Sequence, residues 1–168
     1  MPVVSDFENQ WFSKHLRAAN EPSLFATTSS IRAAGQTVLR FTWLRTFHHP
    51  VIVRVSWSRD RQPVLTTVEL TGAGGYDPGK VKRTTTRNLN PVEIEALHAA
   101  IDAAHLGSVA PRACDFGFDG SEWIFETVNK SGYRAVIRWT PAAGEVRRLG
   151  LTLLRLSRWR FGDARDIY

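Results

Sequence analysis

Four runs of strand-forming residues follow one another between Thr37 and Arg87, and they constrain the fold of this 168-residue chain more than any other feature. They are rich in Val, Leu, Phe, Thr and Trp and occupy residues 38–47, 51–57, 64–70 and 80–87. In the second run the residues from Val51 to Trp57 alternate between an apolar face and a face that carries Arg54. Short turns between consecutive runs predict an antiparallel meander.

Helical patterns and one further hairpin complete the expected fold. Asn90, Pro91 and Glu93 form an N-terminal capping motif, so a helix is predicted over about 91–105. Apolar periodicity predicts two more helices, at about 5–19 and 145–159, and a hairpin of strands 122–128 and 133–139. Segment 23–35 has no clear period and is expected to be irregular. The predicted class is α+β, with a single antiparallel sheet of about six strands in hairpin or meander order and about three helices packed on one face.

The composition indicates one domain over residues 1–168. A hydrophobic content of 43% is too high for a disordered chain, and no apolar run approaches the ~18–20 residues of a membrane span. The single cysteine, Cys114, cannot form an internal disulfide, and residues 1–11 lack the pattern of a secretory signal. We therefore expect a soluble, cytoplasmic protein with no membrane partner.

The net charge of +6 is spread unevenly along the chain. Residues 134–168 contain eight arginines, whereas residues 113–129 contain no Lys or Arg. That second segment carries four carboxylates, Asp115, Asp119, Glu122 and Glu126. This candidate acidic surface either meets the arginines inside the fold, binds a cation, or faces a basic partner. The plainest interpretation of the excess charge is solubility.

The last predicted helix offers a candidate basic surface. On a helical wheel, four arginines share the face opposite the apolar stripe: Arg147, Arg148, Arg155 and Arg158. Trp159 and Phe161 lie nearby in the sequence and could stack on a base or on a partner side chain. An ordinary solvated helix face explains the same pattern, and no recognition-helix or zinc-finger motif accompanies it.

Candidate catalytic and metal-binding residues form no established motif. The glycine-rich loop from Gly72 to Gly79 leads into a strand, which favours a wide hairpin turn over a phosphate-binding loop. His98, Asp102 and His105 lie on one side of a predicted helix, but a closed metal site needs a fourth ligand. Glu122 and Glu126 would be ~13 Å apart on a strand, too far for a paired acid and base. No catalytic residue, metal site or cofactor is predicted.

The predicted second hairpin carries a pattern of its own. Residues 117–126 read Gly-x-Asp-Gly-x-x-Trp-x-x-Glu, and Gly-Tyr and Arg-Trp-Thr-Pro follow within residues 132–141. This pattern resembles a hairpin of small uncharacterised bacterial proteins, which have Ser at the position of Thr140. The resemblance covers about a sixth of the chain and implies no activity. The motif can be wholly structural, but because Glu126 and Arg138 are polar residues on facing strands, an ion pair between them is one testable explanation of the pattern.

Two classes of function fit these observations. The first is a small cytoplasmic, non-enzymatic protein-binding domain, such as an immunity or antitoxin-like protein that neutralises its partner, with the acidic segment or the arginine face as its contact surface. The alternative is a carboxylate- or metal-dependent hydrolase, or a nucleic-acid-binding protein that uses the basic C-terminal helix. The absence of a catalytic motif favours the first class.

Overall fold

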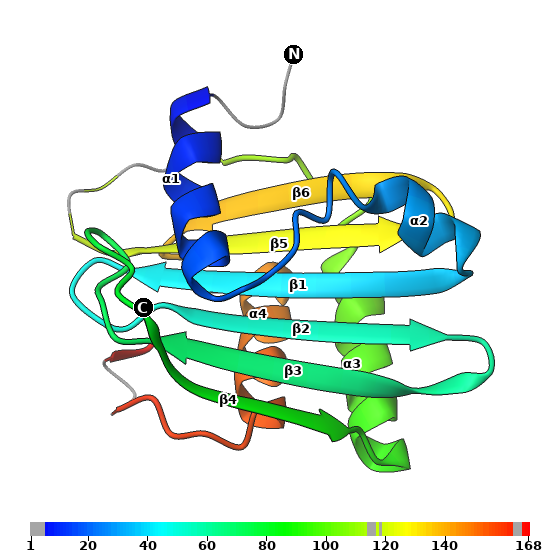
Figure 1. Cartoon of the computed structure of the whole chain (residues 1–168). Helices are drawn as coiled ribbons and strands as arrows, with labels where there is room; N and C mark the ends of the chain where they lie inside the picture. Colours follow the sequence, from blue (N-terminus) through cyan, green and yellow to red (C-terminus); the bar gives the residue numbers. More distant parts are fainter. Residues whose placement is uncertain (1–5, 114–116, 118, 163–165) are drawn as a thin grey trace.

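Six antiparallel strands form one sheet in the order β4-β3-β2-β1-β5-β6 (Figure 1). The computed structural model describes residues 6–113, 117, 119–162 and 166–168, with side chains from residue 12 onward. The strands are β1 (Gln36–Arg45), β2 (Val51–Ser58), β3 (Arg61–Leu70), β4 (Val81–Asn88), β5 (Ser121–Asn129) and β6 (Gly132–Trp139). The first four strands form the predicted meander, and the β5–β6 hairpin joins it by pairing β5 with β1.

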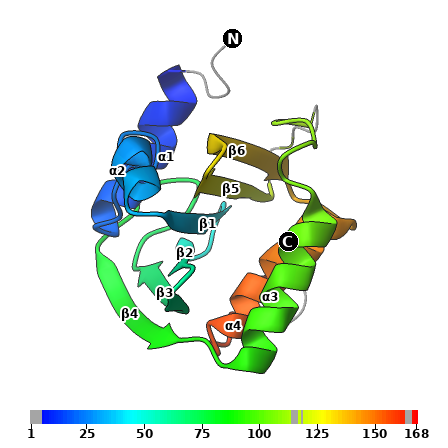
Figure 2. The same ribbon diagram turned by 90° about the vertical axis from the view of Figure 1, so that its right-hand side faces the viewer.

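In the part of the chain that the structure describes, four helices cover the sheet, two on each face (Figures 1 and 2). They are α1 (Asp6–Ala18), α2 (Thr28–Ala33), α3 (Pro91–Ala104) and α4 (Glu145–Leu156). The α+β class and the six-stranded antiparallel sheet are as predicted, but the helices number four and do not share one face. The reason lies in the sheet, because central strands that are buried on both sides need cover on both sides.

Helix α2 lies in the segment expected to be irregular. It has six residues, none of them buried, so it produces no apolar stripe for a periodicity argument to detect. Predicted helix ends differ by a few residues from the observed ones. In particular, α4 ends at Leu156, and the predicted helix continued to Trp159. Ser5, the first residue of the helix predicted over about 5–19, lies outside the described residues.

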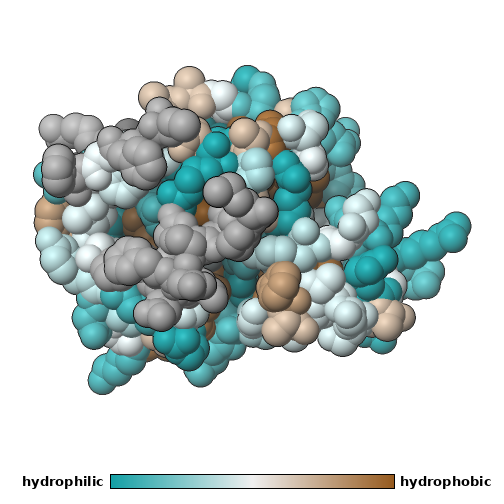
Figure 3. Space-filling model, turned by 90° about the horizontal axis from the view of Figure 1, so that it is seen from above, coloured by the Kyte–Doolittle hydropathy of each residue, from teal (hydrophilic) through white to brown (hydrophobic). Residues whose placement is uncertain are grey.

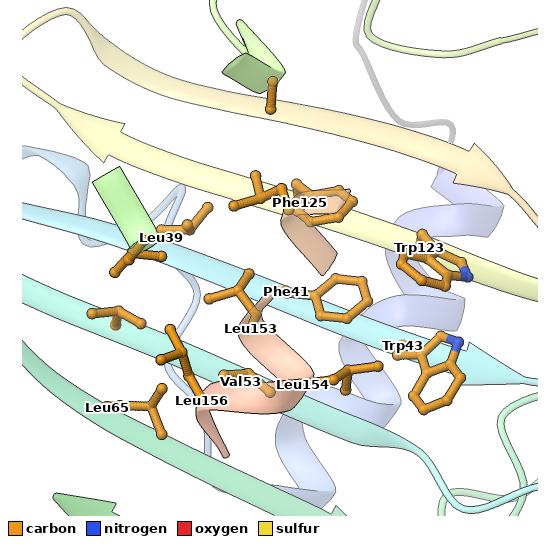
Figure 4. Packing of buried hydrophobic residues seen from close by; sticks show 14 of the residues in the cluster. Leu39, Phe41, Trp43, Val53, Leu65, Trp123, Phe125, Leu153, Leu154 and Leu156 are labelled. Atoms are coloured by element: carbon orange, nitrogen blue, oxygen red, sulfur yellow. The ribbon is translucent and has the colours of Figure 1, made fainter. Parts of the chain in front are cut away.

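The larger hydrophobic core lies between the sheet and the α3–α4 pair (Figure 4). Phe41 is its centre: it stacks on Phe125 with ring centroids 4.7 Å apart and contacts Trp123 at 5.1 Å. Helix α4 approaches the sheet closely at Gly150, where an added Cβ would lie 2.3 Å from the Trp123 ring. Leu153 completes the contact from the next turn of α4 and is fully buried.

Helix α3 begins with the predicted capping box. The Asn90 side chain accepts a hydrogen bond from the Glu93 amide at 2.9 Å, and the Glu93 carboxylate accepts one from the Asn90 amide at 3.0 Å. Pro91 occupies the first helical position, where a missing N–H has no cost. The local sequence therefore sets the start of α3 independently of the rest of the fold.

Hydrophilic residues dominate the surface seen from the β6 side, and hydrophobic residues appear there only in small patches (Figure 3). The large hydrophobic side chains that are exposed elsewhere, such as Phe25 and Val92, come from different elements. Among the helices of the described residues, none combines the length and the apolar character needed to cross a membrane.

Candidate functional site

A row of charged residues crosses the sheet on the face covered by α1. Arg40 of β1 lies directly opposite Arg54 of β2 on one side and Glu126 of β5 on the other. Like charges in directly opposite positions repel. Glu21, from the segment after α1, lies between the two arginines, with its carboxylate 2.9 Å from Arg54 Nε and 3.5 Å from Arg40 Nη1. The row is therefore an alternating ion-pair network.

Arg40 and Glu126 form the buried centre of this network. The Arg40 side chain is fully buried, and its Nε and Nη2 donate to Glu126 Oε2 at 2.8 and 2.7 Å. Its third nitrogen donates to the carbonyl of Pro22 at 2.6 Å. The Tyr133 hydroxyl donates to the other Glu126 oxygen at 3.0 Å. Burial, and then the Glu126 carboxylate, raise the pKa of Tyr133 and keep it a donor.

The predicted ion pair between Glu126 and Arg138 is wrong. In the β5–β6 register Glu126 lies opposite Ala135, and Arg138 lies opposite Trp123. Since side chains alternate between the two faces of a strand, Glu126 and Arg138 point to opposite sides of the sheet. The Arg138 guanidinium donates to the carbonyls of Ile137 and Ala110 at 2.7 and 2.8 Å.

The three candidate acidic residues that the structure describes do not form one surface. Glu126 is buried in the network, and Glu122, two positions before Ile124 on the same face of β5, is half-buried. Asp119 is exposed in the loop before β5, and Asp115 lies outside the described residues. Both oxygens of Glu126 already accept hydrogen bonds, which favours a structural or binding role over acid–base chemistry.

The acidic and basic segments also do not neutralise each other at Glu126, because the sheet separates it from α4 (Figure 2). Arg148, Arg155 and Arg158 are exposed, as expected of a candidate basic surface. Arg147 is half-buried: it donates to the carbonyls of Pro141 and Ile167 at 2.7 and 2.9 Å. The helical wheel placed Arg147 in solvent because it took no account of the segments on either side of α4.

Trp159 and Phe161 both make contacts within the fold. Phe161 is buried in the α3–α4 core, and its ring makes an edge contact with Trp43 at 5.9 Å. Trp159 is half-buried, and the Arg83 guanidinium lies over its ring at 3.9 Å. This contact joins the end of α4 to the edge strand β4.

The second link between α4 and β4 is made by Glu93 at the start of α3. Its carboxylate accepts from Arg87 of β4 at 2.8 and 2.9 Å and from Arg158 at 2.9 Å. Hydrogen bonding from Arg87 is the main cause that lowers the pKa of Glu93 to about 2. The basic residues of β4 and of the α4 terminus therefore form one surface. Sequence analysis missed this surface because about 70 residues separate Arg87 from Arg158.

The glycine-rich loop is a hairpin turn, as predicted. Its amides are bonded within the turn or to the neighbouring β1–β2 loop: Gly72 N donates to Pro78 O at 3.1 Å, and Gly74 N donates to His48 O at 3.0 Å. An added Cβ at Gly74 would lie 2.6 Å from the Arg45 backbone, so this close approach requires glycine. The loop thus packs against the chain and does not cradle an anion.

The three residues considered as metal ligands, His98, Asp102 and His105, lie on α3 or directly after it. His98 and Asp102 are exposed on α3, where the His98 ring lies 6.0 Å from the Trp57 ring. His105 follows α3 in a left-handed conformation with a φ of 45°. Within the part of the chain that the structure describes, no three His, Cys, Asp or Glu residues are grouped so as to hold a metal ion.

Together these features define an α+β protein with a sheet covered on both faces, a buried charge network on one face and a basic open edge. No protein-family model matches the chain, and no curated protein sequence matches it. Its function is therefore inferred from the geometry.

Proposed function

We propose that this chain is a non-enzymatic protein-binding domain that accepts an acidic, extended segment of another protein onto the edge of β4. The observation that carries the proposal is the open edge itself. β4 has eight residues and is the outermost strand, and six of its eight side chains are exposed. An edge strand presents unpaired N–H and C=O groups, and binding domains use such edges to add a peptide as a further strand.

The opposite edge of the sheet differs in this respect. Ile137 of β6 pairs with Arg112 in an isolated parallel bridge, and its amide donates to the carbonyl of Pro111 at 2.7 Å. Within the described residues no strand lies outside β4 in the sheet order. The two edges are thus unequal, and β4 is the one suited to accept a strand.

The charge of β4 favours an acidic partner over a second copy of this chain. β4 carries Lys82, Arg83 and Arg87 and no carboxylate. Two β4 strands paired antiparallel about Thr85 would place Arg83 opposite Arg87, and like charges in that position are destabilising. A strand that carries Glu or Asp at these positions would gain ion pairs instead.

Contacts behind β4 hold the edge in place before a partner arrives. Arg83 is held by the Trp159 ring and by Glu69, whose carboxylate lies 2.5 Å from Arg83 Nε. Arg87 is held by Glu93. A preformed edge reduces the ordering cost of binding. Glu69 and Glu93 also neutralise part of the positive charge of β4, and Glu69 lies 3.6 Å from Lys82 as well as beside Arg83, so the edge attracts a polyanion such as a nucleic acid less strongly.

A domain of this kind would act by binding its partner and blocking the partner's activity, as an immunity or antitoxin-like protein does. Extended segments added to a sheet edge are held mainly by backbone hydrogen bonds. Side-chain charge then selects among partners. The neutralising role thus follows from the mode of binding and needs no catalytic group.

The proposal is tested by titrating the protein with three probes. They are an octapeptide that alternates glutamate and valine, its lysine–valine counterpart, and a DNA duplex of random sequence. We expect the acidic peptide to bind at least about tenfold more tightly than the basic one, a difference of ~1.4 kcal/mol. Lys82→Glu should weaken that binding, whereas Arg148→Glu, the same charge change at the far end of α4, should not.

Proline substitutions separate backbone pairing from simple charge attraction. Alternate residues of an edge strand direct their amides toward the neighbour and toward solvent, so Thr84→Pro and Thr85→Pro remove one amide of each kind. The variant that lacks the solvent-facing amide should keep its thermal stability and should no longer bind the acidic peptide. Normal binding by that variant would overturn the proposal. DNA binding that exceeds peptide binding would instead support the nucleic-acid alternative.

A further inference from the structure

A cavity of about 340 Å³ lies between α1 and the sheet, directly above the buried charge network. Phe12 and Leu16 of α1 form its roof, and Ile124 of β5 and Ala135 of β6 belong to its apolar floor. The cavity is separate from β4, which lies at the other end of the strand order. An inference about it is therefore independent of the proposed partner-binding edge.

The cavity lining is mainly apolar in area, and the polar groups that lie beside the buried network are held in place. Glu126 and Tyr133 line it, and each is already oriented by its hydrogen bond to the other. Thr42 of β1 also lines it; its side chain is 1% exposed, and its hydroxyl has no hydrogen-bond partner among the described residues. Buried hydroxyl groups normally have a hydrogen-bond partner. The unpaired Thr42 hydroxyl beside the cavity therefore indicates that a small guest molecule binds there.

The charges around the cavity favour an uncharged guest. The two carboxylates of the network, Glu21 and Glu126, are matched by the guanidinium groups of Arg40 and Arg54. The remaining charged residue of the lining, Arg17, is exposed to solvent and donates to the Ser13 hydroxyl at 2.9 Å. A charged ligand would therefore bring an uncompensated charge into a buried site, which is costly. The nitrogens of Arg40 are already committed to Glu126, Glu21 and Pro22, so the network offers mainly acceptor oxygens. The guest should therefore carry a donor.

The size of the cavity limits the guest to a small molecule. An engineered apolar cavity of ~150 Å³ is known to hold benzene, so about 340 Å³ admits a molecule of roughly twice that size. Ligand pockets of this volume are mostly apolar with a few orienting polar groups, which is the composition found here.

We propose that the cavity under α1 binds an uncharged, mainly apolar molecule of about the size of a bicyclic aromatic ring, whose hydroxyl donates a hydrogen bond to Glu126 and accepts one from Thr42. The apolar body lies against Phe12, Leu16 and Ile124, and its hydroxyl faces the carboxylate. The Arg40–Glu126 pair thus has two roles: it joins β1 to β5, and it presents an oriented acceptor to the guest.

The test uses three probes of nearly equal shape: 2-naphthol, 2-fluoronaphthalene and 2-naphthoate. Affinities are measured by isothermal titration and by chemical shift changes of the amides of β5 and β6. We expect 2-naphthol to bind at least about tenfold more tightly than 2-fluoronaphthalene, which lacks the donor, since a lost hydrogen bond to a charged acceptor has about that effect. The naphthoate should bind more weakly still, because its charge is unmatched.

Two substitutions locate the bound probe. Ala135→Leu fills the cavity from its floor and should abolish 2-naphthol binding, whereas Ala99→Leu, an equal enlargement at an exposed site of α3 on the opposite face, should leave it unchanged. Thr42→Val preserves the side-chain shape and removes only the hydroxyl. This variant therefore still tests binding in the cavity if Ala135→Leu is poorly folded. We expect it to weaken 2-naphthol binding several-fold.

Three results would overturn the inference. They are an absence of 2-naphthol binding up to its solubility limit, equal affinities for 2-naphthol and 2-fluoronaphthalene, and binding that persists in both Ala135→Leu and Thr42→Val. The last result would place the probe elsewhere on the molecule. Since β4 is intact in all of these variants, binding of the acidic peptide serves as the measure that the fold and the proposed edge site are unaffected.

Discussion

The two faces of the sheet bury different chemistry. On the α3–α4 face a single hydrophobic cluster of 19 buried residues runs without interruption across the strands. On the α1–α2 face the buried hydrophobic residues form three clusters of three or four residues each. Arg40, Glu126 and Thr42 lie on this second face, together with the cavity.

This difference indicates that the two faces of the sheet have different roles. A continuous apolar interface gains free energy from every contact and tolerates no gap. A face that contains buried charges and a cavity gives up part of that gain, and a mostly apolar cavity with a few orienting polar groups is the usual form of a ligand site. We therefore expect the α3–α4 face to supply most of the folding free energy and the α1–α2 face to supply a site.

The largest expected effect is on the apolar face, at Phe41. Phe41→Ala removes a ring that stacks on Phe125 and contacts Trp123, and a buried Phe→Ala change typically costs about 3–5 kcal/mol. Leu16→Ala, on the half-buried roof of the other face, should cost less than half as much. Urea unfolding of both variants measures the difference. Equal losses of unfolding free energy would contradict the division between the faces.

The next effect concerns the buried pair on the other face. Arg40→Met leaves Glu126 buried without its partner, which costs about 3–5 kcal/mol for a fully enclosed pair; we expect the low end because the cavity can admit water. Adding Glu126→Leu should restore most of the loss, since an apolar replacement of a buried pair is often neutral. A double variant as unstable as Arg40→Met would show that the pair is required for pairing β1 with β5.

Local sequence patterns predicted most of the elements but not how they meet. The alternation from Val51 to Trp57 identified the buried face of β2, and Asn90 and Glu93 identified the start of α3, because each signal lies within a few residues. The pairing of β1 with β5 joins residues 86 positions apart, and only that register brings Arg40 opposite Glu126. The buried network and the cavity above it could therefore not be predicted from the sequence alone.

A smaller, pH-dependent effect is expected at Glu93, where the apolar face ends at β4. Hydrogen bonding from Arg87 lowers the pKa of Glu93 from 4.5 to about 2 in the folded protein. A carboxylate with a depressed folded pKa stabilises the protein fully above its unfolded pKa and loses that contribution as the pH falls toward the folded value. The stability difference between the native chain and Glu93→Gln should thus be constant above about pH 5 and shrink between about pH 4.5 and 2.

The control for this experiment is Glu95→Gln, two residues further along α3, where the carboxylate is exposed. Thermal unfolding of the three proteins over the same pH series provides the comparison. A difference between the native chain and Glu93→Gln that does not change with pH would show that Glu93 acts only as the helix cap of α3, through hydrogen bonds that glutamine can also accept.

The smallest effects compare two neighbouring arginines of α4. Arg147 donates to two backbone carbonyls and lies 5.3 Å from the Trp123 ring, so Arg147→Ala should cost about 1–2 kcal/mol, as for other hydrogen bonds from a charged donor. Arg148 is exposed and pairs with Glu145 one turn earlier, so Arg148→Ala should change stability by less than about 0.5 kcal/mol. Added salt screens exposed charge pairs far more than buried contacts, so it should remove the effect at Arg148 and leave most of the effect at Arg147. Equal and salt-sensitive losses would mean that both arginines act as solvent-facing charges, as the helical wheel alone suggests, and that the apolar face does not extend to Arg147.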